Sequence, residues 1–411
     1  MTNNIELKKN SYFASCPKGL EEFLDYELAE FGTKDRNATK GGVNFTASEG
    51  AALDSLLGSR IASRMFYHYC DITMGSEQEF FEMAKQVKWE EIFRVTQSFK
   101  IHCLFGQGPT GMGVKFKSPL YLSQLLKDSI CDHFREQTGI RPDVDKYNPD
   151  LEILLHISAT DHDRYVAKIY FDLAGFSLAH RGYRLKSVGA PLRENLAAAM
   201  VSLVPKDSHL PIIDPMCGSG TLLMERALMS ANIPPSFMHL RKKEVSKRAV
   251  WNLEKTPFLK QFFAKKWEKK MDYFSELAKE GIQKLGSDKF HLIGLDKNNF
   301  PLKEFKSSLS HCNIKGSFDI RNMDAFNFTP DFGEGVVFIN PPYGHRLGEL
   351  QETEELYHQF GEKLKKDYKG CTAYILAPHG GLHKKIGLRT SRKIPVFNGN
   401  IECRILEYKL Y

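Results

Sequence analysis

The stretch that decides the fold is residues 210–222, which read Leu-Pro-Ile-Ile-Asp-Pro-Met-Cys-Gly-Ser-Gly-Thr-Leu. The apolar run from Leu210 to Asp214 predicts a buried strand that ends in an acid. Gly218 and Gly220 favour a loop that a ligand can approach closely, and Thr221 begins a helix whose N-terminal N–H groups face that loop. Ligands bind at the carboxyl ends of strands in open α/β sheets, so this segment predicts a ligand site.

Strand-like and helical segments alternate around this stretch. We expect strands at 210–214, 290–296, 317–320, 336–340 and 372–377, and helices at 191–204 and 353–368. Several of the strands are almost continuously apolar, as in a parallel sheet covered on both faces. Asn398-Gly399, between the runs 392–397 and 401–410, predicts a terminal antiparallel hairpin. The second half of the chain is therefore expected to form a Rossmann-like α/β domain.

The first 170 or so residues have a different pattern. Apolar residues at helical spacing predict a helix near 20–31 and another from Ser118-Pro119 to Gly139. Strands are expected at 151–157 and 165–173. This is an α+β pattern that contains no catalytic motif.

The composition is ordinary for a globular protein, with 42% hydrophobic and 26% charged residues in 411. Two or three domains are expected at this length. We see neither an apolar run of the roughly 20 residues that a membrane helix needs nor a secretory signal at the polar start. The eight cysteines are spaced singly, without a C-x-x-C pair, which disfavours a zinc site or other metal centre. We expect reduced thiols in a cytoplasmic protein.

The net charge of +7 is unevenly placed. Residues 241–270 hold eleven Lys or Arg against three Glu, with Trp251, Phe258, Phe262, Phe263 and Trp267 interleaved. One interpretation is an amphipathic helical insertion whose basic face is solvated. The other is a surface for a phosphate backbone, supported by aromatic side chains.

The chemistry of the glycine loop favours S-adenosylmethionine. A triphosphate loop needs Gly-Lys-Ser/Thr, and the dinucleotide fingerprint reads G-x-G-x-x-G; this loop matches neither. An acid at the end of the strand suits the amine of S-adenosylmethionine. Asp296, after the next apolar strand, suits the ribose hydroxyls, and Asp324 suits the adenine amine, although either acid could instead cap a helix. The residues expected at this site are Asp214, Pro215, Cys217, Gly218, Ser219, Gly220, Thr221, Asp296, Lys297, Asp324 and Ala325.

A second motif, Asn340-Pro341-Pro342-Tyr343, follows a later strand. A purine amine is a poor nucleophile because its lone pair is delocalised into the ring, so an enzyme must favour the tetrahedral nitrogen of the transition state. The Asn340 side-chain oxygen and the Pro341 carbonyl can accept the hydrogens of the amine. Two prolines stiffen the tip, and Tyr343 offers a face for stacking a flipped base. The plain alternative is a tight turn.

These motifs together resemble the bacterial large-subunit rRNA guanine-N2 methyltransferases that carry an N-terminal THUMP domain. The resemblance also rests on Phe13-Ala-Ser-Cys-Pro-Lys-Gly-Leu-Glu-Glu22, Arg141-Pro-Asp-Val-Asp145, Asp172-Leu-Ala-Gly-Phe-Ser-Leu-Ala-His-Arg-Gly-Tyr-Arg184, Ala190-Pro-Leu-Arg-Glu-Asn-Leu-Ala197 and Asn398-Gly-Asn-Ile-Glu-Cys-Arg404. It covers nearly the whole chain.

The resemblance implies a ferredoxin-like segment over 1–65, an RNA-binding THUMP domain over 66–172 and a class I methyltransferase domain over 185–411, with a helical insertion at about 231–288. The implied reaction is transfer of a methyl group from S-adenosylmethionine to guanine N2 in 23S rRNA, with the rRNA or a large-subunit assembly intermediate as partner. Some relatives carry a second methyltransferase domain. Since this chain ends at Tyr411, only the guanine-N2 activity is expected.

Several alternatives stay open on the sequence alone. Related THUMP enzymes modify tRNA guanines with the same Asn-Pro-Pro-Tyr motif, and a non-catalytic assembly factor could keep the fold. A DNA amino-methyltransferase is a third option, which the N-terminal domain disfavours by the family resemblance. Arg181, Tyr183 and Arg184 are either hinge contacts or contacts to the cofactor and RNA. A loop with His379, His383, Lys384, Lys385 and Arg389 is either a substrate contact or a solvated loop.

Overall fold

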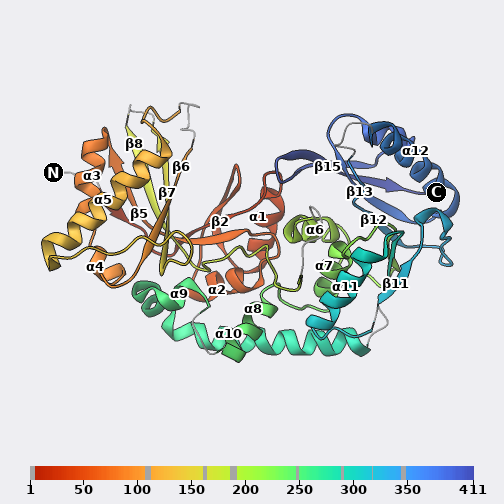
Figure 1. The fold of residues 1–411 in the computed structure, drawn as a ribbon, viewed down its shortest axis with the longest axis horizontal. Helices are drawn as coiled ribbons and strands as arrows, with labels where there is room; N and C mark the ends of the chain where they lie inside the picture. Colours follow the sequence, from red (N-terminus) through yellow and green to blue (C-terminus); the bar gives the residue numbers. More distant parts are fainter. Residues whose placement is uncertain are drawn as a thin grey trace.

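The computed structural model describes residues 5–106, 113–160, 164–185, 192–246, 250–287, 291–316, 318–343 and 349–411. Two sheets form lobes at opposite ends of the molecule, and the long helix α10 (Pro257–Ser287) runs along one side from one lobe to the other (Figure 1). The eight cysteines are all free thiols. Within the ranges above, no helix is long and apolar enough to cross a membrane, and no side-chain cluster suited to a metal ion occurs.

The N-terminal lobe is built on one continuous sheet. Its strands are β1 (Ile5–Leu7), β2 (Ser11–Ser15), β3 (Lys34–Thr39), β4 (Gly42–Thr46), β5 (Arg64–Met74), β6 (Phe99–Phe105), β7 (Leu151–Ala159) and β8 (Tyr165–Asp172). Their order is β3-β4-β2-β5-β8-β7-β6, with β1 beside β5. Because β5 pairs with both β2 and β8, hydrogen bonding continues across residues 65 and 66, where the sequence analysis divides two domains.

The helices of this lobe are α1 (Glu21–Glu30), α2 (Glu49–Gly58), α3 (Glu77–Lys85), α4 (Trp89–Ile92) and α5 (Pro119–Thr138). Helix α5 has the predicted bounds for local reasons. The Ser118 hydroxyl caps it by accepting from the Tyr121 N–H at 3.1 Å, and Gly139 ends it at a φ of +77°. Leu122, Leu126 and Ile130 repeat every four residues on its buried face.

The C-terminal lobe confirms the predicted doubly wound sheet with an antiparallel terminal hairpin. Its strands are β9 (Ile212–Asp214), β10 (Leu292–Asp296), β11 (Phe318–Asn322), β12 (Val336–Ile339), β13 (Thr372–Pro378), β14 (Arg392–Asn398) and β15 (Ile401–Lys409). Their order is β11-β10-β9-β12-β13-β15-β14, and the first five are parallel. The order reverses between β9 and β12, where the crevice of such a sheet binds ligands.

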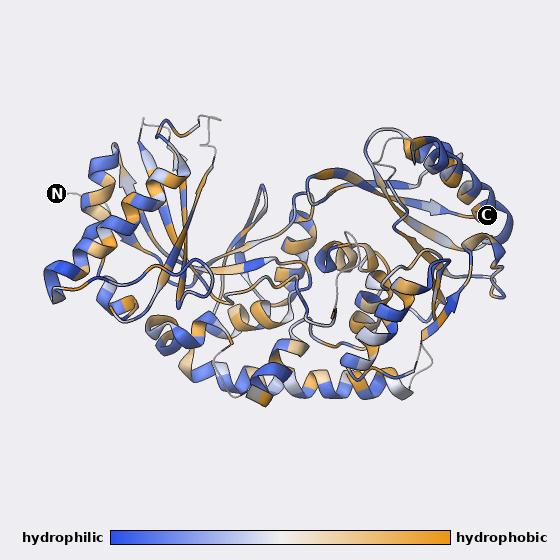
Figure 2. Ribbon diagram, in the orientation of Figure 1, coloured by the Kyte–Doolittle hydropathy of each residue, from blue (hydrophilic) through white to orange (hydrophobic). Residues whose placement is uncertain are grey.

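Its helices and short 3-10 turns are α6 (Glu194–Val201), α7 (Thr221–Ser230), α11 (Asn299–His311), η1 (Ala325–Asn327), α12 (Glu349–Asp367) and η2 (Leu382–Ile386). Hydrophobic residues are concentrated on the strands of both lobes (Figure 2). The parallel strands are buried on both faces, as their sequence predicted: all four residues of β12 are buried.

Between α7 and β10 the chain forms α8 (Phe237–Ser246), α9 (Asn252–Lys255) and α10. The buried residues of α10 form one stripe along its length: Leu259, Phe263, Trp267, Met271, Phe274, Ala278, Gly281 and Leu285. Phe258 and Phe262 pack on the ring of Tyr67 in β5, with centroids 5.5 and 5.1 Å away. The interleaved aromatics thus hold the helix to the N-terminal lobe. These two rings therefore do not form an exposed stacking surface. A contact between the basic face of the segment and a phosphate backbone stays a prediction.

The two lobes are joined by buried and partly buried polar contacts. The Arg60 guanidinium donates to the Ile233 carbonyl at 2.6 Å, and the Ser236 hydroxyl donates to the Leu57 carbonyl at 2.7 Å. Burial lowers the pKa of Arg60 to about 10. Buried hydrogen bonds are costly to leave unmade, so these contacts hold the lobes in one relative orientation.

A turn of the N-terminal lobe also touches the terminal hairpin. The Lys18 ammonium lies 4.2 Å from the centre of the Phe397 ring. Gly19 has a φ of +88°, and a Cβ added there would lie 2.7 Å from the Pro395 carbonyl oxygen and 2.8 Å from the Val396 Cα. Figure 1 shows the hairpin of β15 reaching toward α1. The backbones are therefore in direct contact at this glycine.

Gly19→Ala is expected to lower the melting temperature and to weaken the docking of this turn on β14. Gly41→Ala is the matched control, because Gly41 has a φ of +87° and open space around an added Cβ. Both variants incur the left-handed strain of about 1–2 kcal/mol, but only Gly19→Ala must displace β14. Thermal unfolding of the two proteins side by side checks this, and an equal loss in both would show that the contact contributes nothing.

Candidate active site

The two sequence motifs end neighbouring strands of the C-terminal sheet. Strand β9 ends at Asp214, and Asn340 follows β12 directly. The strands are in register side by side, with Ile213 opposite Val337. On the other side of β9, Asp214 itself lies opposite Gly294 of β10. The glycine loop and the prolyl tip therefore share the carboxyl edge of the sheet at the point where the strand order reverses.

The glycine loop leaves β9 through a tight turn. The Asp214 carboxylate accepts the Met216 N–H at 3.1 Å, and the Gly220 N–H donates to the Cys217 carbonyl at 2.8 Å. Gly218 has a φ of +54°, and nothing lies within 4 Å of the place where its Cβ would be, so a ligand can approach the backbone there. Gly220, at a φ of +74°, instead packs against the Phe305 ring, which an added Cβ would meet at 2.5 Å.

The turn decides which of the other loop residues are buried. Pro215 and Cys217 are buried, Ser219 is half-buried, and Thr221 is the buried first residue of α7. The open side of the loop is thus formed by Gly218 and Ser219, with the start of α7 behind it.

Asp296 joins the glycine loop to the next strand. One carboxylate oxygen accepts the Gly218 N–H at 2.9 Å, and the other accepts the Asn298 N–H at 2.8 Å. Helix α11 is capped by Asn298, so the alternative that Asp296 is its N-cap is wrong. Lys297, the next residue, is exposed. Asp296 is half-buried, and its position beside Gly218 suits a ligand that lies on the loop.

Asp324 lies at the outer end of the same edge, after β11. Its side chain accepts the Phe326 N–H at 2.9 Å and caps η1, so the capping alternative holds here. Ala325 is buried as the first residue of η1. A carboxylate has more than one acceptor position. The capping bond of Asp324 is therefore compatible with the predicted contact to the adenine amine, which stays a prediction.

The prolyl tip is held by the terminal hairpin. Pro341 is buried, Pro342 is exposed, and Asn340 and Tyr343 are half-buried. The Tyr343 hydroxyl donates to the Asn340 side-chain oxygen at 3.0 Å, and the Asn398 amide donates to that hydroxyl at 3.2 Å. The sequence analysis assigned no role at the site to Asn398, which it used as part of a turn signal and of the family resemblance.

The electrostatics of the edge are set by Asp214. Asp214 is buried, with 2% of the residue exposed. Burial first and then the nearby charge of Asp296 raise its pKa from an ordinary value of 3.8 to about 8, although the Met216 N–H opposes the shift. A raised carboxyl pKa means that the folded state holds the proton more tightly than the unfolded chain. The free energy of unfolding therefore falls as the pH rises from about 4 to about 8.

This raised pKa predicts a pH-dependent affinity for a ligand that brings a positive charge to Asp214. The proton must leave when an ammonium group binds, so the affinity should rise by about tenfold per pH unit below the pKa and level off above it. We expect this for S-adenosylhomocysteine between pH 6 and 8, measured by calorimetry. In Asp214→Asn the binding should be weaker and flat with pH. An unchanged pH profile in that variant would place the ammonium group elsewhere.

The linker residues are hinge contacts in this structure. Arg181 is fully buried and its guanidinium donates to the carbonyl of Arg60, while the Tyr183 hydroxyl donates to the Glu225 carboxylate at 3.0 Å. The Arg184 guanidinium donates to the Thr221 hydroxyl at 2.9 Å, directly behind the glycine loop. The alternative that Arg181 contacts RNA phosphate is wrong, because this side chain has no exposed surface.

The loop after β13 lies at the same edge as the two motifs, because β13 is parallel to β12. Lys384 and Arg389 are exposed there, whereas Lys385 is paired with Glu354 at 2.8 Å. Burial, followed by nearby cations, lowers the pKa of His383. Contact between this positive surface and a substrate strand stays a prediction.

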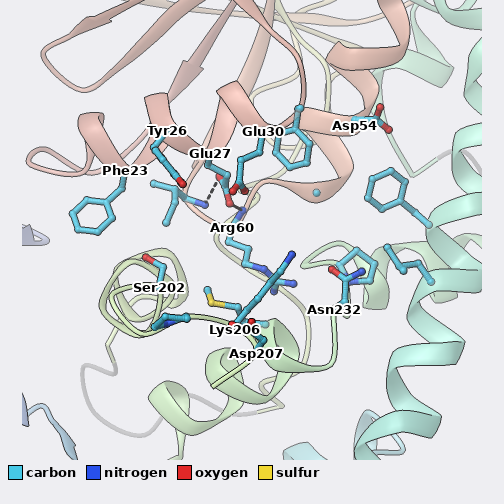
Figure 3. Close-up of a pocket in the computed structure, with 18 of the residues that line it drawn as sticks. Phe23, Tyr26, Glu27, Glu30, Asp54, Arg60, Ser202, Lys206, Asp207 and Asn232 are labelled. Atoms are coloured by element: carbon cyan, nitrogen blue, oxygen red, sulfur yellow. Dashed lines mark hydrogen bonds between the residues drawn. The ribbon is translucent and has the colours of Figure 1, made fainter. Parts of the chain in front are cut away.

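A cavity of about 1130 Å³ lies away from this edge, between the two lobes (Figure 3). Residues of α1, α2 and α10 line it, together with the segments that follow α6 and α7, and Figure 3 shows Glu27, Glu30 and Arg60 facing it. Its described lining includes none of the predicted site residues. Acidic and basic side chains are mixed in it. Lys206 and Asp207 line the cavity and precede β9, so they lie at the end of that strand opposite to Asp214. We therefore assign the cavity to the interface between the lobes and not to the active site.

Comparison with known families agrees with this arrangement. Residues 181–407 match the RMKL-like methyltransferase domain, residues 75–161 match the THUMP domain, and residues 11–66 match the RlmL ferredoxin-like domain. The first match alone covers more than half of the chain. The chain belongs to this family of THUMP-containing methyltransferases. Its methyltransferase domain uses S-adenosylmethionine as the methyl donor.

Two curated relatives place the chain within the family. It is 30% identical to "Putative RNA methyltransferase slr0064" of Synechocystis sp., over 100% of this chain and 99% of that protein. It is 31% identical to the ribosomal RNA large subunit methyltransferase K/L of Syntrophotalea carbinolica, over 97% of this chain. The chain spans about half of the K/L relatives, 53% in that case.

Solved structures share the fold of this chain over nearly its whole length. "A possible methylase" from Clostridium difficile 630 superimposes with a TM-score of 0.79 at 22% identity, and covers 98% of this chain and 99% of its own. TrmN from Thermus thermophilus gives a TM-score of 0.65 at 16% identity, covering 97% and 99%. At these identities the likeness shows the fold alone.

The described residues fit the cofactor of the family. Gly218 leaves the backbone open where a ligand would lie, and no cationic side chain in the described part of the chain pairs with the buried Asp214 carboxyl. Asp296 lies between the loop and the next strand. An open loop, a buried acid and a half-buried acid at adjacent strand ends suit a ligand with an ammonium group and a ribose.

Proposed function

We propose that this enzyme transfers a methyl group from S-adenosylmethionine to the exocyclic N2 amine of a guanine in RNA, and that the RNA is 23S rRNA. The observation that carries the proposal is the placement of Asn340 beside the glycine loop, at the ends of the neighbouring strands β12 and β9. A methyl donor on the loop and a base at the tip would then meet at one edge of the sheet.

The residues of the tip would act on the amine as hydrogen-bond acceptors. The Asn340 oxygen already accepts one hydrogen bond, from Tyr343, and a carbonyl oxygen has a second lone pair for a substrate N–H. The Pro341 carbonyl is the second proposed acceptor. Two acceptors aimed at the amine favour the tetrahedral nitrogen that develops in the transition state over the planar one of the free base.

The remaining residues would bind and orient the donor. Asp214 is proposed to take its ammonium group, Asp296 its ribose hydroxyls and Asp324 its adenine amine. The donor supplies an electrophilic methyl group on a cationic sulfur. The amine nitrogen becomes acidic once it is methylated, so it can lose its proton to water without a dedicated base at the tip.

The proposed substrate rests on the relatives and on the THUMP domain. The K/L relatives are named as ribosomal RNA large subunit methyltransferases, and the relative of equal length is named as an RNA methyltransferase. A guanine N2 amine is paired or stacked inside a duplex, so the target must be unpaired or flipped out to reach the tip.

The experiment is methylation of unmodified RNA transcripts by the purified protein. 23S rRNA, 16S rRNA and tRNA transcripts are incubated separately with labelled S-adenosylmethionine, digested to nucleosides and analysed by mass spectrometry. We expect N2-methylguanosine in the 23S digest. Methylation of tRNA alone would overturn the rRNA assignment, label in another nucleoside would overturn the guanine-N2 assignment, and S-adenosylmethionine binding without any methylation would point to a non-catalytic assembly factor.

A further inference from the structure

The hairpin of β14 and β15 contacts the prolyl tip through polar side chains. Asn398 is the last residue of β14, and Gly399 turns the chain at a φ of +64° into β15. Strand β15 is bound along β13, so that Cys403 lies opposite Pro378 at the carboxyl edge of the sheet. The hairpin therefore brings Asn398 to the tip from a segment 55 residues away in the sequence.

Three side chains form a directed chain of hydrogen bonds at this point. The Asn398 amide nitrogen donates to the Tyr343 hydroxyl at 3.2 Å. The same hydroxyl donates to the Asn340 side-chain oxygen at 3.0 Å. An amide oxygen can only accept, so the single hydrogen of the Tyr343 hydroxyl points at Asn340, and Asn398 donates to a lone pair of the same hydroxyl.

The direction of these hydrogen bonds fixes the orientation of the Asn340 carboxamide, with its oxygen toward the Tyr343 hydroxyl. A carboxamide can rotate to exchange its oxygen and nitrogen, and only the oxygen accepts a hydrogen bond. If the amide turned over, its NH2 group would face the Tyr343 hydroxyl, and the acceptor for a substrate amine would be lost. Tyr343 is half-buried, and the Cys403 side chain is a further hydrogen-bonding neighbour of its hydroxyl, so the hydroxyl is held rather than free to rotate in water.

We propose that Asn398 is a positioning residue for methyl transfer, which acts through the Tyr343 hydroxyl to keep the Asn340 oxygen turned toward the substrate amine. This assignment rests on the proposed function of Asn340. It gives the Tyr343 hydroxyl a task that is separate from stacking by its ring. It also gives Asn398, which the sequence analysis used for the turn signal and for the resemblance, a role at the tip.

The test compares single-turnover methyl transfer in Tyr343→Phe, Asn398→Ala and the double variant, at saturating S-adenosylmethionine and RNA. Phe keeps the ring and loses only the hydroxyl. We expect each single variant to be slower by about tenfold, the loss for one positioning hydrogen bond. The dissociation constants for S-adenosylhomocysteine and RNA should stay within about twofold of wild type, because the chain acts on the transition state.

The double variant decides whether the residues act as one unit. Since Asn398 is proposed to act only through the hydroxyl, the double variant should be no slower than Tyr343→Phe alone. Losses that multiply to about 100-fold would overturn the proposal, because independent effects multiply. A wild-type rate in Tyr343→Phe would overturn it as well.

A further variant reverses the direction of the chain. In Asn398→Asp the carboxylate only accepts, so the Tyr343 hydrogen turns away from Asn340, and the rate relative to wild type should fall at neutral pH and recover as the acid is protonated. A pH-independent ratio would contradict the directed chain. Tyr408→Phe is the matched control for folding, because the Tyr408 hydroxyl in β15 is buried and has no hydrogen-bond partner among the residues that the structure describes. Its rate should match wild type.

The wild-type digest separates this inference from the proposed function. If wild-type protein methylates a different nucleoside, the guanine-N2 proposal fails, and the same four variants still test the chain on the product that forms. If N2-methylguanosine forms and the double variant shows multiplied losses, the proposed function stands and the positioning role of Asn398 fails.

Discussion

Asn340→Ala is expected to lower the single-turnover rate of methyl transfer by about 10²–10³-fold, the cost of removing one preorganised hydrogen-bonding group at a reacting centre. The affinity for S-adenosylhomocysteine should change by less than about twofold, since the tip is proposed to contact the base rather than the donor. Asn340 follows β12 and is half-buried, so the loss of its side chain leaves the strand intact. Quenched-flow sampling of labelled RNA measures the rate, and calorimetry measures the affinity.

Two further variants make this result specific to the acceptor. Asn340→Asp keeps an oxygen at the tip and should lose less activity than Asn340→Ala. Asn400→Ala removes an exposed carboxamide from the turn of the terminal hairpin and should stay near wild type. Full activity in Asn340→Ala would refute the role of Asn340 and remove the basis for the positioning role of Asn398.

Asp296→Ala has the second largest expected effect, on binding rather than on rate. The dissociation constant for S-adenosylhomocysteine should rise by about 100-fold, since hydrogen bonds to a charged group contribute about 1.5–3 kcal/mol. Two causes combine in this variant. The ribose hydroxyls lose their proposed acceptor, and the Gly218 N–H loses the carboxylate that holds the glycine loop at 2.9 Å.

The control for this variant lies one strand away. Asp319 in β11 is exposed and paired with Arg321, so Asp319→Ala should leave the dissociation constant unchanged. Calorimetric titration of both variants at one pH gives the comparison. Wild-type affinity in Asp296→Ala would show that the ribose lies elsewhere on the edge.

Much of the C-terminal lobe could be predicted because its signals are local. The run Leu210 to Asp214 reads as a buried strand from its own side chains, and the adjoining glycines permit the turn that follows it. Helix α5 has its predicted ends because Ser118 and Gly139 are themselves the capping residues. The parallel order then brought Asp214, Asp296 and Asn340 to one edge, as expected for strands that all run the same way.

Other features could not be predicted because they depend on contacts between distant segments. The aromatic residues of 251–267 carry the same signal whether they pack inward or stack on a nucleic acid, and only the packing of Phe258 and Phe262 on Tyr67 separates the two. Strands β3 and β6, at the two edges of the N-terminal sheet, gave no clear pattern, because most of their residues are only partly buried or exposed. The division at 65 and 66 also falls within a sheet that β5 joins together.

Residue order alone was sufficient to place a buried acid, an open glycine turn and a stiff asparagine tip at strand ends, because strand runs and turn chemistry depend on a few adjacent residues. The folded arrangement was needed to show that Asn398 reaches Tyr343, that Gly19 lies against Pro395, and that Asp214 is buried deeply enough to raise its pKa to about 8. These properties arise from which remote segments pack together, and burial and hydrogen-bond direction exist only once that packing has formed.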